Sequence, residues 1–134
     1  MKVVIDADVL IGALDRSDPH HQKARALFTR WHDQGTSRLI SVVNLTEVLV
    51  APAADHQRLR TARKAIAALG VIVHQPTEVV GVEAARLRHT YPISLPDAYC
   101  LATAKHTGST VASFDRNLIR AANAEQITHT ASKT

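Results

Sequence analysis

Short runs of apolar, mostly β-branched residues recur along the chain, separated by longer stretches whose apolar positions follow helical spacing. Four runs predict β-strands, at residues 3–5, 38–43, 71–74 and 110–113. A fifth, short strand is expected at 126–129. Val3, Val4 and Ile5 have no polar residue among them. Such a run is typical of a strand that is buried on both faces of a parallel sheet.

The stretches between the strands predict helices, which we expect at residues 9–15, 20–34, 44–50, 55–69, 78–90, 94–108 and 116–122. The helix over 55–69 has a clear apolar face, formed by Leu59, Ala62, Ile66 and Leu69. Strands and helices alternate through most of the chain, with no repeat, linker or low-complexity segment. The pattern therefore predicts one α/β domain over residues 1–134, with a mostly parallel sheet between helical layers. We expect the last few residues, Ala131 to Thr134, to fray.

The composition narrows the class of protein only slightly. A chain of 134 residues with 46% hydrophobic content is long enough for one full core. The net charge of +4 is compatible with a nucleic-acid partner without requiring one. Cys100 is the only cysteine, which excludes a disulfide framework and fits a reducing, cytoplasmic location. The sequence contains no apolar run long enough to span a membrane.

Four acidic residues stand where chemistry is expected in such a fold. Asp6 follows the first predicted strand, Glu47 the second and Asp115 the fourth, whereas Asp97 opens a helix with no strand directly before it. Three of the four have a structural reading as well: Asn44-Leu-Thr-Glu47 and Ser94-Leu-Pro-Asp97 fit capping patterns, and Asp115 fits an N-cap. Capping and ligand binding do not exclude each other, because a helix N-terminus keeps a carboxylate ionised.

The carboxyl ends of parallel strands share one edge of the sheet, which is where α/β folds bind their ligands. Two carboxylates about 5 Å apart repel by roughly 3 kcal/mol at an effective dielectric constant near 20. Converging carboxylates must therefore protonate, move apart or hold a cation. An all-oxygen set favours Mg²⁺ or Mn²⁺ over zinc, and carboxylate-held Mg²⁺ suits phosphodiester hydrolysis.

Four segments together resemble the signatures of PIN-domain ribonucleases. They are Val-Val-Ile-Asp6-Ala-Asp-Val-Leu-Ile, Asn44-Leu-Thr-Glu47-Val, Ser94-Leu-Pro-Asp97-Ala-Tyr-Cys-Leu-Ala102 and Thr110-Val-Ala-Ser-Phe-Asp115-Arg-Asn-Leu118. Their order and the chain length resemble in particular the VapC toxins of bacterial toxin–antitoxin pairs. The resemblance covers nearly the whole chain, and its specificity lies in the ordered set, because each motif alone is weak.

The resemblance implies an α/β/α sandwich with a sheet of four to five strands, and a metal-dependent endoribonuclease. Asp6, Glu47, Asp97 and Asp115 would form the Mg²⁺ or Mn²⁺ site, with Ser113 as the hydroxyl residue that precedes the last acid. It also implies cleavage of structured RNA, such as a tRNA or an rRNA loop. Inhibition by a cognate VapB-like antitoxin, whose C-terminal segment blocks the site, and a homodimer are implied as well.

Two further residues adjoin the predicted site. Asp8 stands where the family often has Asn, Ser or Thr, so the chain carries an extra carboxylate. Asp8 either contributes to the metal site, directly or through water, or caps the helix that is expected to begin at Val9. Arg116 follows Asp115 and is a candidate contact for a substrate phosphate. The eight histidines show no metal-ligand spacing, and we interpret them as surface or loop residues.

Two other functions remain open from the sequence. Asp6-Ala-Asp8 after an apolar strand also resembles the nucleophile motif of haloacid-dehalogenase-type phosphatases, with Asp6 as nucleophile and Asp8 as acid/base. The later pair of neighbouring aspartates of that family is missing from the sequence. The other alternative is a non-catalytic PIN-like module that binds RNA or a protein. The complete acidic set argues against it, because a binder has no use for the mutual repulsion.

Overall fold

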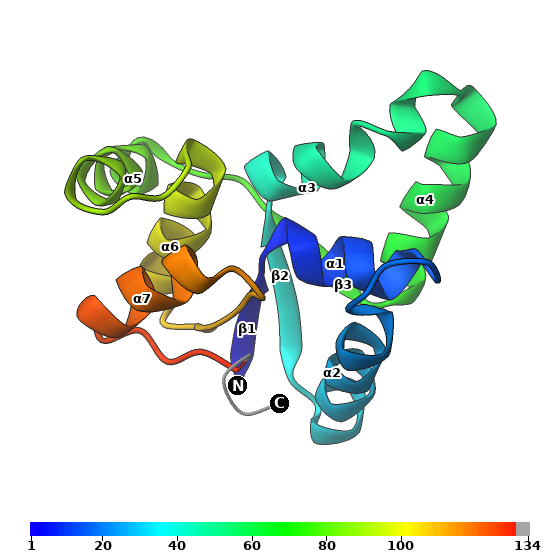
Figure 1. Cartoon of the computed structure of the whole chain (residues 1–134), viewed down its shortest axis with the longest axis horizontal. Helices are drawn as coiled ribbons and strands as arrows, with labels where there is room; N and C mark the ends of the chain where they lie inside the picture. The colour runs from blue at the N-terminus through cyan, green and yellow to red at the C-terminus, as the bar shows by residue number, and fades with distance from the viewer. Residues whose placement is uncertain (131–134) are drawn as a thin grey trace.

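The fold is built on a four-stranded sheet, seen in a computed structural model that describes residues 1–130 (Figure 1). The strands are β1 (Lys2–Ile5), β2 (Ser37–Ser41), β3 (Val71–His74) and β4 (Thr110–Ala112). They pair in the order β3-β2-β1-β4, and every pairing is parallel. All four strands therefore end at the same edge of the sheet.

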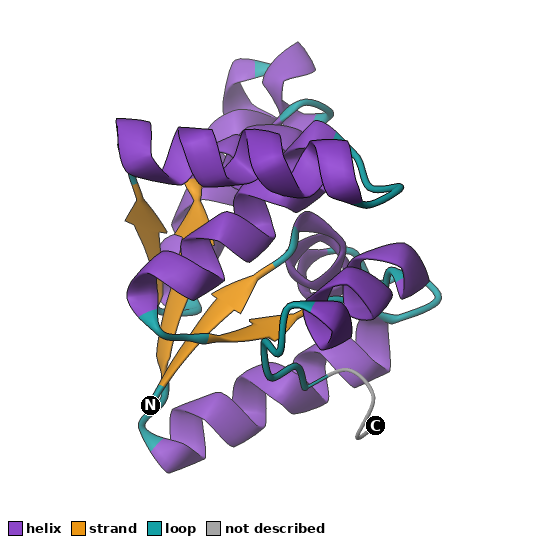
Figure 2. Cartoon of the chain, turned by 90° about the vertical axis from the view of Figure 1, so that its left-hand side faces the viewer, coloured by secondary structure: helices purple, strands orange, loops and turns teal. Residues whose placement is uncertain are grey.

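Seven α-helices and one short 3₁₀ helix connect the strands in the described part of the chain. The bounds are α1 (Ala7–Leu14), α2 (His21–Gln34), α3 (Val42–Leu49), η1 (Pro52–Ala54), α4 (His56–Ala68), α5 (Glu78–Thr90), α6 (Leu95–Thr107) and α7 (Arg116–Ala124). Figure 1 shows α5, α6 and α7 on one side of the sheet and α1, α2 and α4 on the other. The turned view in Figure 2 shows the same three layers, so the predicted α/β/α sandwich is confirmed.

Two apolar cores hold the layers together, one on each face of the sheet. Val4 packs with the core under α5, α6 and α7, whereas its neighbours Val3 and Ile5 pack with the core under α1, α2 and α4. All three side chains are at most 1% exposed. This is the alternation that a strand covered on both faces requires, and it confirms the interpretation of this run as a buried strand.

Two predicted helix starts that matter for the site are wrong. Helix α1 begins at Ala7 and is capped by Asp6, whose side chain accepts the Ala7 N–H, so Asp8 is not its cap. Helix α3 begins at Val42 and is capped by Ser41, so Asn44 lies inside the helix rather than at its start. In both places the chain turns from strand into helix almost without a loop, and the polar residue at the end of the strand takes the cap: Ser41 is the last residue of β2, and Asp6 directly follows β1.

The fifth strand expected at 126–129 does not form. His129 makes only an isolated parallel bridge to Val111, and Gln126 has a positive φ of 60°, which breaks the extended backbone. The expected fraying of Ala131 to Thr134 lies outside the described residues. Within residues 1–130, no helix combines the length and the apolar character that crossing a membrane demands.

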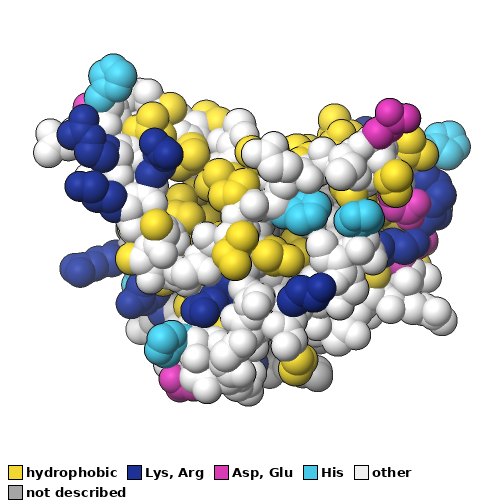
Figure 3. Space-filling view, turned by 180° about the vertical axis from the view of Figure 1, so that it is seen from behind, with side chains coloured by type: hydrophobic (Ala, Val, Ile, Leu, Met, Phe, Trp, Pro, Cys, Tyr) yellow, Lys and Arg dark blue, Asp and Glu magenta, His cyan; other side chains and the backbone are white. Residues whose placement is uncertain are grey.

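Helix α4 carries four exposed basic residues, Arg58, Arg60, Arg63 and Lys64. Figure 3, seen from behind, shows Lys and Arg side chains gathered on the side of the molecule where α4 lies. The face of the molecule drawn in Figure 3 also shows hydrophobic side chains at the surface. Some large apolar residues are well exposed, including Val50, Ile72, Val79 and Val82, each more than half exposed.

Candidate active site

A polar pocket of about 510 Å³ lies at the edge where the strands end. It draws its walls from the starts of α1, α6 and α7, from α3, and from the loop that enters α6. Five carboxylates line it: Asp6, Asp8, Glu47, Asp97 and Asp115. We call this cavity, with its five carboxylates, the acidic pocket. The other lining residues are Ala7, Ile11, Pro92, Ile93, Ser94 and Asn117, so no lysine or arginine of the described chain lines it.

Asp6 sits at the base of the acidic pocket and is only 4% exposed. Its Oδ1 accepts the Ala7 N–H at 2.8 Å, and its Oδ2 accepts the Ser113 hydroxyl at 2.7 Å. The backbone N–H of Asp6 donates to the Ala112 carbonyl, which joins the ends of β1 and β4. Asp6 is therefore fixed by its neighbours on both strands before any ligand enters.

Asp8 lies in the first turn of α1, two residues after Asp6, and lines the same pocket. Its Oδ2 accepts the Phe114 N–H at 3.0 Å, which ties α1 to the segment after β4. Its Oδ1 is buried and has no hydrogen-bond partner among the described residues. A buried carboxylate oxygen without a donor is costly, so this atom is available for a cation or a bound water.

Ser113 and Asp115 complete this side of the pocket. Ser113 is fully buried behind Asp6, and its Oγ donates to Asp6 while accepting the Asp115 N–H at 3.0 Å. Asp115 caps α7, since its Oδ1 accepts the N–H groups of Asn117 and Leu118. The predicted N-cap is confirmed, and the same residue lines the acidic pocket.

Glu47 enters the pocket from α3, and Asn44 holds it there. Asn44 is completely buried, and its Nδ2 donates to Glu47 Oε1 at 3.2 Å and to the Pro96 carbonyl at 3.1 Å. Asn44 therefore joins Glu47 to the first turn of α6. The sequence predicted that Asn44 begins the helix and that Glu47 reaches back to cap it. Because α3 begins at Val42, the pair instead lies inside the helix, where it forms an i, i+3 side-chain contact.

Asp97 comes from the first turn of α6, the position that the sequence left least certain. Ser94 caps this helix by accepting the Asp97 N–H at 3.2 Å, which leaves the Asp97 carboxylate free to face the pocket. Pro96 lies in the first turn, where a missing N–H costs nothing. The α5–α6 loop thus brings Asp97 to the strand edge although no strand precedes it.

The acidic pocket is electrostatically unfavourable as it stands. Burial, together with the charges of Asp8 and Asp97, raises the pKa of Asp6 well above its usual range. Burial and the charges of Asp115 and Asp97 raise the pKa of Asp8 to about 6. Burial, followed by the charges of Asp115 and Glu47, raises the pKa of Asp97 to about 6 as well. The pocket therefore favours the binding of positive charge.

The donor set fits a hard divalent cation. Its charged groups are all carboxylates, and one of their oxygens, Asp8 Oδ1, is buried without a partner among the described residues. Within residues 1–130, no three acidic, histidine or cysteine side chains stand close enough together to form a ready cage for one ion. This open spacing fits an ion that keeps several of its waters and takes few protein ligands, as Mg²⁺ does.

Two aromatic residues beside the pocket were not singled out by the sequence. Phe114 lies between Ser113 and Asp115, and the His20 ring stacks on it with centroids 4.5 Å apart. Arg116 is exposed at the first position of α7 but does not line the pocket. No sequence signal could have found the stack, because it joins residues that are far apart in the chain.

A second, mostly apolar groove of about 580 Å³ adjoins the acidic pocket. It runs between α1, α3 and α4, with Leu14, Val48 and Ala62 among its lining residues. Ile11 and Glu47 line both cavities. An extended or helical segment seated in this groove would therefore reach the acidic pocket directly.

The fold is similar to that of several solved toxin structures. A toxin–antitoxin complex of Klebsiella pneumoniae superimposes with a TM-score of 0.69 at 24% identity, covering 86% of this chain and 88% of that one. VapC20 of Mycobacterium tuberculosis gives a TM-score of 0.73 at 18% identity, covering 89% and 94%. VapBC-1 of nontypeable Haemophilus influenzae gives 0.75 at 12% identity over 100% of both chains. At these identities the likeness is one of fold.

Sequence comparison assigns the family. No curated protein sequence gives a significant match to the chain. A family model described as the PIN domain matches residues 3–124, which include all five carboxylates of the acidic pocket and nearly the whole described fold. The chain therefore belongs to the PIN domain family.

Proposed function

We propose that this protein is a metal-dependent endoribonuclease and the toxin of a VapBC-type toxin–antitoxin pair, acting in the cytoplasm. The observation that carries the proposal is the acidic pocket: five carboxylates from four helices face one cavity that no described lysine or arginine lines. Such a cluster is a stability cost unless a cation neutralises it. A PIN domain with this pocket is therefore equipped for phosphodiester hydrolysis.

In this proposal Asp6, Glu47, Asp97 and Asp115 form the Mg²⁺ or Mn²⁺ site, binding the ion directly or through the waters that it keeps. The bound ion would activate a water and neutralise charge on the phosphoryl oxygens. Ser113 keeps Asp6 oriented through the 2.7 Å hydrogen bond to Oδ2. Asp8 offers its unpartnered Oδ1 to the ion or to a water of its shell. Asn44 holds Glu47 toward the pocket.

Structured RNA, such as a tRNA or an rRNA loop, is the proposed substrate. Support comes from the overall charge of +4 and from Arg116, which is exposed next to Asp115 and can meet a phosphate. It also comes from VapC20, a structural neighbour described as a sarcin–ricin loop cleaving toxin. The phosphate contacts would position the RNA, and the acidic pocket would act on the bond.

A cognate VapB-like antitoxin is the proposed inhibitor. Structural neighbours include toxin–antitoxin complexes from Klebsiella pneumoniae and Haemophilus influenzae. The apolar groove along α1, α3 and α4 gives an inhibitory segment a place to bind, and Arg58 at its wall can pair with an acid of that segment. Because Glu47 lines both cavities, a segment in the groove would also cover the acidic pocket.

A homodimer is the proposed assembly. Val79 and Val82 of α5 are 67% and 66% exposed, and Ile72 of the edge strand β3 is 56% exposed. Exposed apolar side chains of this size favour burial against a partner. Sedimentation of the purified protein, compared with a Val79→Glu/Val82→Glu variant, tests this point: the variant is expected to sediment as a monomer.

The alternative of a phosphatase with Asp6 as nucleophile is disfavoured by the sequence. The later pair of neighbouring aspartates that such phosphatases carry is missing from the chain. In the structure the Ala7 N–H and the Ser113 hydroxyl each occupy one lone pair of the Asp6 carboxylate. The remaining lone pairs face the acidic pocket, which suits a metal ligand.

The decisive experiment is RNA cleavage by the purified protein with Mg²⁺ or Mn²⁺, with EDTA, and with the variant Asp6→Asn. Cleavage with either ion, none with EDTA and none by a folded Asp6→Asn variant would support the proposal. Sequencing of RNA ends after induced expression would then identify the target. Cleavage that survives both EDTA and Asp6→Asn would show that the acidic pocket is not the active site.

A further inference from the structure

His20 presents one open face of an aromatic ring beside the acidic pocket. Its imidazole stacks on the Phe114 ring with centroids 4.5 Å apart and an interplanar angle of 18°. The side chain of His20 is 47% exposed, as expected for a flat ring with one face covered and the other in solvent. Phe114 is itself partly buried against the core under α1, α2 and α4. The stack is therefore backed by the protein interior.

Local hydrogen bonds fix the backbone of His20. Its N–H donates to Asp18 Oδ1 at 2.8 Å, and its carbonyl accepts the Ala24 N–H at 2.9 Å at the start of α2. The Asp18 carboxylate also lies 3.7 Å from the imidazole Nδ1. A ring held in this way loses little conformational freedom when a second planar group stacks on it, which lowers the entropic cost of binding.

The segment under this ring belongs to the acidic pocket. Phe114 donates its N–H to Asp8. The residue before it, Ser113, donates its hydroxyl to Asp6, and the residue after it, Asp115, lines the pocket. The ring on which His20 stacks is therefore tied to Asp8 by a backbone hydrogen bond and stands between two residues of the site in the chain. The His20–Phe114 stack lies at the margin of the acidic pocket.

The surroundings of His20 favour an anionic, base-bearing ligand. Lys23 follows one helical turn after His20 on α2, and Arg116 lies two residues after Phe114; both are exposed and form no ion pair with a carboxylate of residues 1–130. An exposed ring with unpaired cations close by in the chain is a combination by which proteins bind single-stranded nucleic acid. A peptide or a lipid would need an apolar contact surface, which a half-exposed imidazole does not offer.

We propose that His20, backed by Phe114, is the stacking platform for an unpaired base of the RNA that flanks the phosphodiester bond in the acidic pocket. This inference rests on the proposed nuclease function and names a recognition element of the same site. It predicts that the substrate must be unpaired beside the cleaved bond, because a base inside a duplex cannot stack on a side chain. His20 is thus a substrate-binding residue whose contribution depends on the base.

Binding of two oligonucleotides that differ only in their bases tests the platform. The first probe is a short fluorescein-labelled oligoadenylate, and the second has the same length and the same phosphates but abasic sugars. Fluorescence anisotropy in EDTA, which stops metal-dependent cleavage, gives the Kd of each for wild-type protein and for His20→Ala. We expect His20→Ala to weaken oligoadenylate binding by about fivefold or more and to leave the abasic probe unchanged.

Two further variants separate stacking from charge and from fold. His20→Phe keeps the ring and should retain most of the oligoadenylate affinity. His32→Ala removes another exposed histidine from the opposite end of α2 and should bind both probes like the wild type. With an RNA that the wild type cleaves, His20→Ala should raise KM and leave kcat within about twofold, since the base contact is made equally before and during the reaction.

Each contrary result has a definite meaning. Equal losses on both probes would assign His20 to phosphate binding or to folding, and no loss on either probe would remove it from the binding surface. Wild-type protein that does not prefer oligoadenylate to the abasic probe, or a His20→Phe variant as weak as His20→Ala, would also overturn the platform. These binding results are independent of cleavage: if the wild type cleaves with Mg²⁺ and only the His20 effects are absent, the nuclease proposal stands alone.

Discussion

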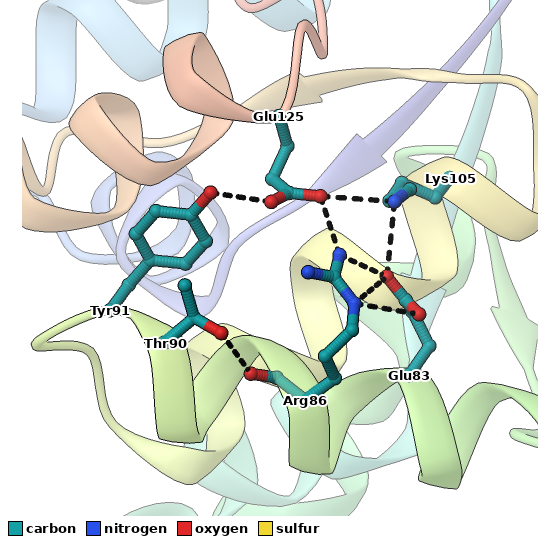
Figure 4. Close-up of polar contacts among 6 residues, drawn as sticks. All are labelled: Glu83, Arg86, Thr90, Tyr91, Lys105 and Glu125. Carbon is teal, nitrogen blue, oxygen red and sulfur yellow. Dashed lines mark hydrogen bonds and ion pairs between the residues drawn. The ribbon is translucent and has the colours of Figure 1, made fainter.

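Two clusters of charged residues in this molecule follow opposite rules. On α5, α6 and the end of α7, Glu83, Arg86, Tyr91, Lys105 and Glu125 form what we call the ion network (Figure 4). Arg86 and Lys105 each contact both glutamates, and Tyr91 donates its hydroxyl to Glu125. Every carboxylate in the ion network has a cationic partner, whereas the acidic pocket gathers five carboxylates with none among its described lining residues.

The pKa values of the two clusters move in opposite directions for this reason. Hydrogen bonds from Arg86 and Tyr91 lower the pKa of Glu125 to about 2, and the hydrogen bond from Arg86 lowers the pKa of Glu83. In the acidic pocket, burial and like charges raise the pKa values of Asp8 and Asp97 to about 6. Acids that the fold pairs with cations stabilise it, whereas acids that it leaves unpaired are candidates for binding a ligand.

The largest expected effect is that of Asp97→Asn on cleavage. We expect a loss of more than about a hundredfold, because removing a metal-facing carboxylate should exceed the ~10–100-fold cost of losing an outer-shell partner. The same change should raise the Tm of the metal-free protein, since it removes one charge from a repulsive group. Gel assays of RNA cleavage and thermal unfolding measure the two effects. A variant that cleaves normally would separate Asp97 from the site.

Glu125→Gln should show the reverse pattern. The side chain is only 11% exposed and accepts hydrogen bonds from three partners, so its neutralisation removes the centre of the ion network. Because Arg86 and Lys105 are themselves more than a third exposed, water screens part of the loss, and we expect the Tm to fall by about 4 °C. Cleavage measured well below the Tm should be unchanged. A loss of activity in the folded variant would contradict the division between the two clusters.

The pH dependence of stability should come from the acidic pocket. The pKa values of Asp8 and Asp97 are raised in the folded state, so the metal-free fold binds more protons than the unfolded chain between pH 3.8 and about 6, and stability falls as the pH rises through this window. Glu125 contributes stability that is lost only as the pH falls toward 2. Added Mg²⁺ should therefore raise the Tm more at neutral pH than at pH values well below 6.

Thermal unfolding with and without Mg²⁺ across this pH range measures the effect, with Asp97→Asn as the control that reduces it. The comparison between wild type and variant subtracts the titration of the histidines, which both proteins share. An Mg²⁺ effect that is the same at both ends of the range would show that cation binding is not linked to the deprotonation of these acids.

The smallest expected effect is that of Arg116→Ala. Arg116 is exposed and lies outside the acidic pocket, so its loss should leave metal binding and fold intact. One phosphate contact in solvent is expected to change KM by about threefold to tenfold and to reduce the salt dependence of RNA binding. Titrations at several salt concentrations measure both quantities. Arg120→Ala, one turn further along α7, is the matched control.

Much of the fold could be predicted from local sequence. The run Val3-Val4-Ile5 predicted a buried strand because both faces of the strand had to be apolar, and the helix at 78–90 matches α5 residue for residue. The errors lie where strand passes directly into helix. Helix α3 begins directly after Ser41, the last residue of β2, and only Asp6 separates β1 from α1. Local propensity alone does not say which polar residue near such a junction caps the helix.

The candidate site divides in the same way. That Asp6, Glu47 and Asp115 share an edge followed from parallel strand topology, because side chains at strand ends meet wherever strands run in one direction. Asp97 could not be placed by this rule, since the loop between α5 and α6 sets its position. The roles of Asn44 and His20 depend on partners such as Pro96 and Phe114, more than fifty residues away in the chain.

By itself, the sequence determined the order and approximate positions of four strands and seven helices, the number of carboxylates in the chain and the family pattern in which they occur, because these depend on residue type and short-range spacing. Only the tertiary structure decided which carboxylates meet a cation and which do not. Glu125 and Asp97 are both acidic residues at helix ends, yet packing gives Glu125 the side chains of Arg86 and Lys105 and gives Asp97 the charges of Asp115 and Glu47. The function of an acid in this molecule follows from its neighbours, which are fixed by long-range packing.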